Sequence, residues 1–254
     1  MTMFLDDYSP RDLQIQNEIV LPMLLGCPPF VESRSKRLYV GFEQYAVFNS
    51  ILTGLRPKVA LEIGTFEGQT LGLISRHSER VVSIDPDPSV EQKLSPQMPN
   101  CRFITDTSDA ILPALISKFN EENTPLEFVF VDGNHSRDFV YRDLTNLLNY
   151  RPVTRTVILM HDSFNPNCRS GILDVDWSRC PNCHYVEVDF CPGLVHLNQE
   201  CRGEMWGGLG FALLLPEKRT SNLVIRQTHR FTFEAALAKQ SQFRKSWLHR
   251  LLGK

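Results

Sequence analysis

The sequence predicts an α/β fold: a doubly wound, mostly parallel sheet, preceded by helices and followed by a cysteine-rich loop insertion and a basic C-terminal helix. Short, continuously apolar runs alternate with helical segments five times between residues 58 and 162. Each run stops at a glycine or an aspartate, the last of which follows a histidine. Strands without polar alternation are typical of parallel sheets that helices cover on both faces.

The individual elements follow from the apolar periodicity and from the residues that interrupt it. Two N-terminal helices are predicted over residues 10–25 and 41–52, the second closed by Gly54. The predicted strands of the sheet cover 58–63, 81–84, 102–105, 127–131 and 156–160. The helices between them cover 70–76, 110–120 and 137–149. Residues 163–206 predict a loop insertion, 210–215 and 223–233 two further strands, and 235–252 a basic helix.

Four acidic residues follow the predicted strands, namely Asp85, Asp106, Asp132 and Asp162, while Gly64 follows the first strand. In open α/β sheets the ligand binds at the carboxyl ends of the strands. Four carboxylates at one edge repel each other unless a ligand, a cation or helix caps satisfy them. The sequence therefore places the candidate binding site at this edge of the sheet.

Composition limits the classes of function. The chain has 254 residues, a mass of 29.1 kDa, a formal charge of −2 and a pI near 6.4, which argues against nucleic-acid binding through bulk positive charge. It holds no apolar run of about 18 residues, so we expect no integral membrane segment. Its seven cysteines are an odd number, and no basic stretch precedes an apolar run at the N-terminus, so we expect a cytoplasmic location.

The length fits one large domain with additions. We expect residues 1–55 to form an N-terminal helical extension. Residues 56–254 would form the main domain, including the insertion at 163–206 and the C-terminal basic helix at 235–254.

A glycine-rich turn follows the first predicted strand, with the sequence Glu62-Ile-Gly64-Thr-Phe-Glu-Gly68. Glycine at a strand-to-helix turn lets the backbone approach a ligand closely. The spacing G-x-x-x-G differs from the G-x-G-x-x-G of dinucleotide-binding proteins and from the phosphate loop of nucleoside triphosphatases, which contains Gly-Lys-Ser/Thr. A nicotinamide enzyme and a nucleoside triphosphatase are therefore disfavoured, and a tight turn without a ligand is the remaining alternative.

This turn, together with Asp85 at the end of the second strand, resembles the class I S-adenosylmethionine-dependent methyltransferases, whose fold is Rossmann-like. The resemblance implies that the turn holds the methionine and ribose part of the cofactor, that Asp85 accepts from the ribose hydroxyls and that Asp106 contacts the adenine. Asp109 competes with Asp106 for this role, and either could instead cap a helix. The implied cofactor-binding residues are Glu62, Gly64, Thr65, Phe66, Gly68, Asp85, Asp106 and Asp132.

A second motif joins Asp132-Gly-Asn-His135 to the pair His161-Asp162. It is similar to the methyltransferase-24 type and to magnesium-dependent O-methyltransferases of macrolide-sugar tailoring. The resemblance implies catalytic roles for Asp132 and for His135, the general base, and a divalent metal on Asp132, His161 and Asp162. Imidazole in place of a carboxylate suits manganese, zinc or iron better than magnesium, which leaves Mg, Mn and Zn open. In the alternative interpretation, the aspartates cap loops and His135 is an ordinary loop residue.

Five cysteines gather between residues 168 and 201, with two histidines among them: Cys168, Cys180, Cys183, His184, Cys191, His196 and Cys201. Three interpretations stay open. The cysteines are reduced thiols in a substrate lid, or Cys180 and Cys183 belong to a structural zinc site, or they form a redox pair. The C-terminal helix packs on the domain or on a second subunit, or lies on an anionic membrane.

These observations favour an S-adenosylmethionine-dependent methyltransferase that acts on a hydroxyl of a small molecule, a sugar or a natural product. The expected partner is this acceptor, with no nucleic acid, and the oligomeric state, including a homo-oligomer, is open. Two alternatives are an adenosyl- or metal-binding protein that does not methylate and a zinc-stabilised module that binds a partner protein.

Overall fold

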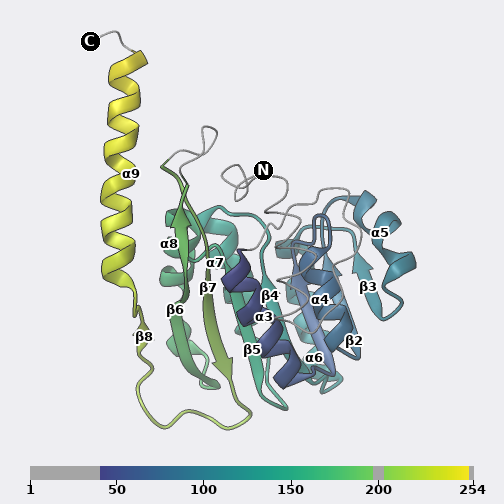
Figure 1. Cartoon of the computed structure of the whole chain (residues 1–254). Helices are drawn as coiled ribbons and strands as arrows, with labels where there is room; N and C mark the ends of the chain where they lie inside the picture. Colours follow the sequence, from purple (N-terminus) through teal and green to yellow (C-terminus); the bar gives the residue numbers. More distant parts are fainter. Residues whose placement is uncertain (1–40, 197–202, 252–254) are drawn as a thin grey trace.

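The computed structural model describes residues 41–196 and 203–251, and Figure 1 shows the chain. Eight strands form one sheet in the order β3-β2-β1-β4-β5-β7-β6-β8. The first five strands pair in parallel, whereas β7 runs antiparallel to β5 and to β6, and β8 pairs in parallel with β6. The predicted mostly parallel α/β fold is therefore confirmed. The strands are β1 (Val59–Ile63), β2 (Arg80–Ile84), β3 (Cys101–Ile104), β4 (Leu126–Val131), β5 (Thr156–His161), β6 (Cys183–Val195), β7 (Met205–Leu214) and β8 (Ile225–Arg226).

Helices cover both faces of the sheet because each central strand points apolar side chains to both sides (Figure 1). The helices are α3 (Phe42–Leu55), α4 (Gln69–His77), α5 (Pro88–Leu94), α6 (Ser108–Glu121), α7 (Arg137–Leu147), α8 (Pro166–Asp174) and α9 (Arg230–Leu251), with short 3-10 turns at Ser95–Gln97 and Trp177–Arg179. One core cluster joins the sheet to α6, α7 and α8, and the other joins it to α3, α4 and α5.

Helix α3 packs directly on the sheet, although the sequence assigns it to an N-terminal extension. Phe48 is fully buried, and its ring centroid lies 5.4 Å from that of Phe128 and 4.7 Å from that of Phe130, both on β4. The helix runs through Gly54 to Leu55, three residues beyond the predicted end at Leu52, and ends where Arg56 adopts a left-handed conformation. The helix predicted over 10–25 lies outside the described residues.

The described part of the stretch 163–206 is not a loop insertion, so that prediction is wrong there. It holds α8, a 3-10 turn, the long strand β6 and the start of β7. Helix α8 begins at a capping residue, because the Asn165 side chain accepts hydrogen bonds from the backbone N–H groups of Asn167 and Cys168. Pro166 takes the first helical position, where its missing N–H costs nothing. Strands β6 and β7 extend the sheet beyond β5.

The predicted strand at 223–233 is also wrong over most of its length. Only Ile225 and Arg226 pair with β6, and helix α9 has begun by Arg230. The reason is a buried acidic pair on β6: Glu187 accepts from the backbone N–H of Thr228, and Asp189 accepts from that of His229. These hydrogen bonds direct the chain out of the sheet after Arg226. No local sequence pattern indicates this change of direction.

The first turn of α9 docks on the main domain. The ring of Phe233 lies edge-on to that of Phe164, with 5.5 Å between the centroids, and the Arg169 guanidinium stands 4.2 Å from the Phe233 centroid. Arg169 also pairs with buried Asp189 at 2.5 Å. Beyond its first turns, α9 extends away from the sheet in Figure 1. Whether this part of the helix contacts a second subunit or an anionic membrane stays a prediction. No helix in the described ranges is long and apolar enough to cross a membrane.

Candidate functional site

The turn between β1 and α4 passes so close to the end of β4 that its first residue has to be glycine. Gly64 has φ of +84°, and a Cβ there would stand 2.1 Å from the carbonyl oxygen of Asp132. Phe66 also has a positive φ, of 50°, and its side chain is 62% exposed. Gly68 has φ of +78° and faces Leu94, so its role is to pack the turn rather than to line the cavity.

Asp85, directly after β2, holds this turn in place. Its Oδ2 atom accepts hydrogen bonds of 2.9 Å from the backbone N–H groups of both Thr65 and Phe66. Its Oδ1 atom accepts from the backbone N–H of Asp87, also at 2.9 Å. A carboxylate oxygen has two acceptor sites, so one site on Oδ1 stays available to a ligand.

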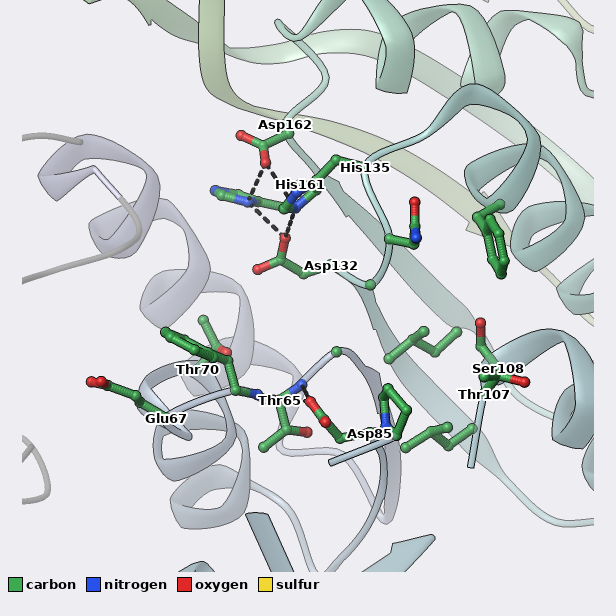
Figure 2. Close-up of a pocket in the computed structure, with 18 of the residues that line it drawn as sticks. Thr65, Glu67, Thr70, Asp85, Thr107, Ser108, Asp132, His135, His161 and Asp162 are labelled. Carbon is green, nitrogen blue, oxygen red and sulfur yellow. Dashed lines mark hydrogen bonds and ion pairs between the residues drawn. The ribbon is translucent and has the colours of Figure 1, made fainter. Parts of the chain in front are cut away.

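The turn and Asp85 form one end of a cavity of about 570 Å³, within the range of small-molecule sites. Figure 2 shows this cavity, with Thr65 and Asp85 near one end and the Asp132–His161 region near the other. Of the two acids that compete for the adenine position, Asp106 lines the cavity and Asp109 does not. The lining residues are Ile63, Gly64, Thr65, Phe66, Glu67, Gln69, Thr70, Ile84, Asp85, Pro86, Asp106, Thr107, Ser108, Asp132, Gly133, Asn134, His135, Phe139, His161, Asp162 and Trp206.

Two aspartates and two histidines meet at the far end of the cavity, because β4 and β5 are parallel neighbours whose ends coincide. The Nδ1 atom of His161 lies 2.9 Å from Oδ1 of Asp132 and 3.5 Å from Oδ2 of Asp162. The Nε2 atom of His135 lies 3.1 Å from Oδ2 of Asp162 and 3.4 Å from Oδ1 of Asp132. The two motifs thus meet at the edge of the sheet where the sequence places the candidate site.

Opposite charges dominate the electrostatics of this cluster. Burial by itself raises the pKa of Asp132, but the charge of His161 and the hydrogen bonds from both histidines outweigh it and lower the pKa to about 2. Burial lowers the pKa of His161, yet the charges of Asp132 and Asp162 raise it well above its usual value. The pKa of His135 is raised for the same reason, by Asp132 and Asp162 against the effect of burial.

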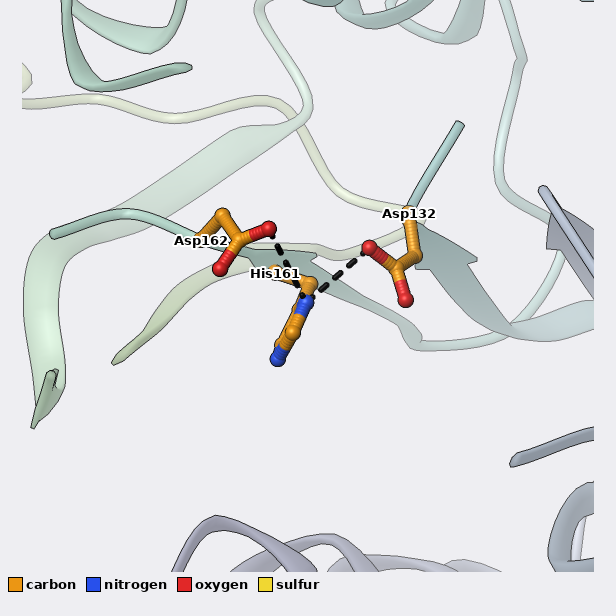
Figure 3. Close-up of side chains that lie close together, drawn as sticks. All are labelled: Asp132, His161 and Asp162. Carbon is orange, nitrogen blue, oxygen red and sulfur yellow. Dashed lines mark hydrogen bonds and ion pairs between the residues drawn. The ribbon is translucent and has the colours of Figure 1, made fainter. Parts of the chain in front are cut away.

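Within the described part of the chain, one group of three or more ligating side chains is close enough to share a cation: Asp132, His161 and Asp162, whose ligand atoms lie within 4.8 Å of one another (Figure 3). Asp162 is held rigidly, because its Oδ1 atom accepts from the backbone N–H of Gly207 on β7 at 2.5 Å. Two carboxylates and one imidazole are donors that suit manganese or iron better than magnesium.

The cysteines form no comparable group among the residues that the structure covers. Cys168, Cys180 and Cys183 are buried free thiols within the core that joins the sheet to α6–α8. Burial raises the pKa of Cys183 to about 12 and also raises that of Cys180, which keeps both in the unreactive thiol form. Reduced cysteine often serves as a small apolar core residue, and this explains the cluster here. Cys201 lies outside the described residues.

Glu62 lies beneath the turn and does not line the cavity. It is fully buried on β1, and its Oε2 atom accepts a hydrogen bond of 2.9 Å from the Thr65 hydroxyl. Burial raises its pKa from 4.5 to about 8, although hydrogen bonds from Thr70 and Thr65 act in the opposite direction. The residue therefore supports the turn as a neutral acid.

Replacing Glu62 with glutamine is expected to change how stability depends on pH. The unfolded chain releases the Glu62 proton near pH 4.5, whereas the folded chain keeps it up to about pH 8. The wild-type protein therefore loses stability as pH rises between these values, by about 3 kcal/mol over two pH units. Urea unfolding of both proteins at about pH 5 and about pH 7 measures this. If the unfolding free energies of the wild type and Glu62→Gln change equally with pH, the pKa of Glu62 is not raised in the folded protein.

Sequence reasoning misses two residues of the site. Gln44, on α3, bonds to His161 from 117 positions away, with its Oε1 atom 3.2 Å from Nε2. Trp206, on β7, lines the cavity, and its ring centroid lies 5.4 Å from that of His135 in an edge-on arrangement. Neither belongs to a local motif, and only the pairing of α3 and β7 with the central strands brings them here.

Comparison with known proteins agrees with this geometry. The methyltransferase-24 family model, described as a methyltransferase domain, matches residues 61–163. No curated protein matches the chain. Among solved structures, cofactor-bound Rv0187 from MTB superposes with a TM-score of 0.52 at 13% identity, covering 84% of this chain and 100% of that chain.

Two further similar structures are those of an O-methyltransferase and of a methyltransferase. The O-methyltransferase TomG from Streptomyces achromogenes, involved in tomaymycin synthesis and solved with SAM, has a TM-score of 0.51 at 14% identity and covers 85% of this chain and 93% of its own. The methyltransferase MycE, from the mycinamycin biosynthetic pathway, was solved with Mg, SAH and mycinamycin VI. It has a TM-score of 0.48 at 14% identity, and the match covers 87% of this chain and 66% of MycE. Residues 61–163 thus resemble a methyltransferase domain, and Rv0187 and TomG share the Rossmann-like fold of this chain.

Proposed function

We propose that this protein transfers a methyl group from S-adenosylmethionine to a hydroxyl oxygen of a small molecule, a sugar or a natural product. One observation carries the proposal: a single cavity joins the Gly64–Asp85 end to the Asp132–His135 end. The first end offers backbone groups and a carboxylate that can hold the methyl donor, and the second offers a base for the hydroxyl acceptor. Methyl transfer needs the donor and the acceptor side by side in one enclosed space.

The residues present fit the cofactor. Gly64 lines the cavity with its backbone, and Asp85 keeps one acceptor site on Oδ1 for a ribose hydroxyl. Asp106 stands at the cavity wall, where it would accept from the adenine amino group. When bound, S-adenosylmethionine supplies an electrophilic methyl group.

His135 would take the proton from the acceptor hydroxyl. Its ring borders the cavity, and Asp132 and Asp162 lie within 3.4 Å of Nε2, so the carboxylates orient the ring and stabilise it once it is protonated. The edge-on Trp206 ring forms an apolar wall beside it, against which a sugar or aromatic face of the acceptor would pack.

The cluster also fits a divalent cation. Asp132, His161 and Asp162 would hold it, with manganese favoured over magnesium by the imidazole ligand. When bound, such a cation lowers the pKa of a hydroxyl that contacts it and so assists the base.

Calorimetric titration with S-adenosylmethionine and S-adenosylhomocysteine, with and without Mn²⁺ or Mg²⁺, tests the cofactor directly. We expect both to bind, and we expect radiolabelled methyl groups to appear on hydroxyl acceptors in a panel of sugars and natural products. Binding without transfer to any acceptor would favour an adenosyl-binding protein that does not methylate. If neither compound binds, the proposed function is wrong.

A further inference from the structure

Gln44 reaches the Asp–His cluster from outside the matched methyltransferase domain. It sits in the first turns of α3, its side chain is 2% exposed, and its Oε1 atom lies 3.2 Å from Nε2 of His161. The helix that carries it is fixed, because Phe48, one turn further on, packs on Phe130 of the central sheet. The contact therefore joins a rigid helix to a rigid strand.

The chemistry of this contact determines where the His161 proton resides. A side-chain amide oxygen can accept a hydrogen bond but cannot donate one, so Nε2 of His161 must carry the hydrogen. The other ring nitrogen, Nδ1, faces Oδ1 of Asp132 at 2.9 Å and Oδ2 of Asp162 at 3.5 Å. Without a cation, Nδ1 also carries a hydrogen and donates it to Asp132. When a cation displaces that hydrogen, Nε2 still donates to Gln44, and Nδ1 is left as the ligating atom beside the two carboxylates.

We infer that Gln44 is a positioning residue that orients His161 so that Nδ1 serves as a metal ligand beside Asp132 and Asp162. A histidine ligand needs its second ring N–H to be held by an acceptor, which fixes both the tautomer and the ring angle. The inference rests on the cation of the proposed function. It adds that α3 completes the site, although this helix lies outside the family match.

The same helix offers a matched control. Asn49 is also buried on α3, and its Oδ1 atom lies 3.2 Å from Nε2 of a different histidine, His77. His77 is not among the residues that line the cavity. Substitution of Asn49 therefore removes the same type of amide–imidazole contact from the same helix without touching the cluster.

The test measures Mn²⁺ binding to the cofactor-free full chain, by electron paramagnetic resonance of the unbound ion. We expect Gln44→Leu to weaken Mn²⁺ binding about 10- to 100-fold, as loss of an outer partner of a histidine ligand does. Gln44→Glu, which keeps an acceptor oxygen, should bind at least as tightly as the wild type. Asn49→Leu should stay within about twofold. A Gln44→Leu protein that binds like the wild type, or an equal loss in Asn49→Leu, overturns the inference.

A second measurement needs no variant to fold. Long-range proton–nitrogen NMR of the wild type with diamagnetic Zn²⁺ should show the His161 hydrogen on Nε2, and a hydrogen on Nδ1 instead overturns the inference. S-adenosylmethionine titration of the same samples separates this outcome from the proposed function. A wild type that binds S-adenosylmethionine but neither metal ion removes the role of Gln44 and leaves methyl transfer standing. A wild type that binds the metal but not S-adenosylmethionine removes methyl transfer alone.

Discussion

Replacing Asp85 with alanine is expected to abolish measurable S-adenosylmethionine binding, with a loss in affinity of at least about 100-fold. The carboxylate accepts from the backbone N–H groups of Thr65 and Phe66 and thereby holds the Gly64 turn in its binding shape. Hydrogen bonds to a charged group contribute about 1.5 kcal/mol or more each, so losing two costs about 3 kcal/mol. This corresponds to a loss of about 100-fold in affinity before any direct contact with the ribose is counted.

Calorimetry on three proteins checks this result. Asp87→Ala is the matched control, because Asp87 lies two residues further on and caps α5 by accepting from the backbone N–H of Ser89. This control should lose about 1 kcal/mol of unfolding free energy but keep its affinity for S-adenosylmethionine. An Asp85→Ala protein that binds within tenfold of the wild type, while Asp87→Ala does the same, would remove Asp85 from the cofactor site.

The part of the fold that the sequence predicts best is the parallel half of the sheet. Strands β1, β2, β4 and β5 are buried on both faces, so their residues are mostly apolar, and Gly64, Asp85, Asp132 and Asp162 directly follow these strands. Because parallel strands end at one edge, this pattern also locates the site. The residues Asp85, Asp106, Asp132 and Asp162 all line the same cavity.

In the antiparallel part of the sheet, the predicted strand at 210–215 coincides with the end of β7, but β6 escapes prediction for a physical reason. Strand β6 contains buried Glu187 and Asp189, whose charges are satisfied by the segment before α9 and by Arg169, so its pattern is not that of an apolar strand. The cysteines of this region suggest chemistry by their spacing, yet Cys180 and Cys183 are buried core residues. Long-range partners, rather than local periodicity, decide these elements.

The same distinction applies within the site. His135 lies three residues after Asp132, so the short motif alone indicates that the two are neighbours, and their contact is 3.4 Å. Gln44 and Trp206 come from α3 and β7, which flank the matched domain in the sequence. A local motif thus identifies the groups that we propose to react, whereas tertiary packing brings in the groups that we propose to orient them and to contact the acceptor.

Replacing His135 with alanine is expected to leave S-adenosylmethionine binding within about twofold of the wild type and to lower kcat by about 10² to 10⁴, the usual contribution of a general base. Binding is spared because the Gly64–Asp85 end of the cavity does not depend on this ring. Turnover falls because no other imidazole in the described part of the chain borders the cavity except His161, whose Nε2 atom is engaged by Gln44. His229→Ala, at an exposed position before α9, is the matched control and should be fully active.

The pH profile separates a base from a merely structural histidine. Burial lowers the pKa of His135, but the hydrogen bond that its ring donates to Asp132 and the charge of Asp162 outweigh it, so the pKa lies above its usual value of 6.5. The base works only when neutral, and the wild-type kcat should therefore rise with pH through this raised pKa. His135→Ala should lose this limb of the profile, and added imidazole should restore part of the rate by entering the space that the ring leaves. A variant that keeps the limb at a reduced rate would assign the proton transfer to another group, and His135 would then only orient Asp132 and Asp162.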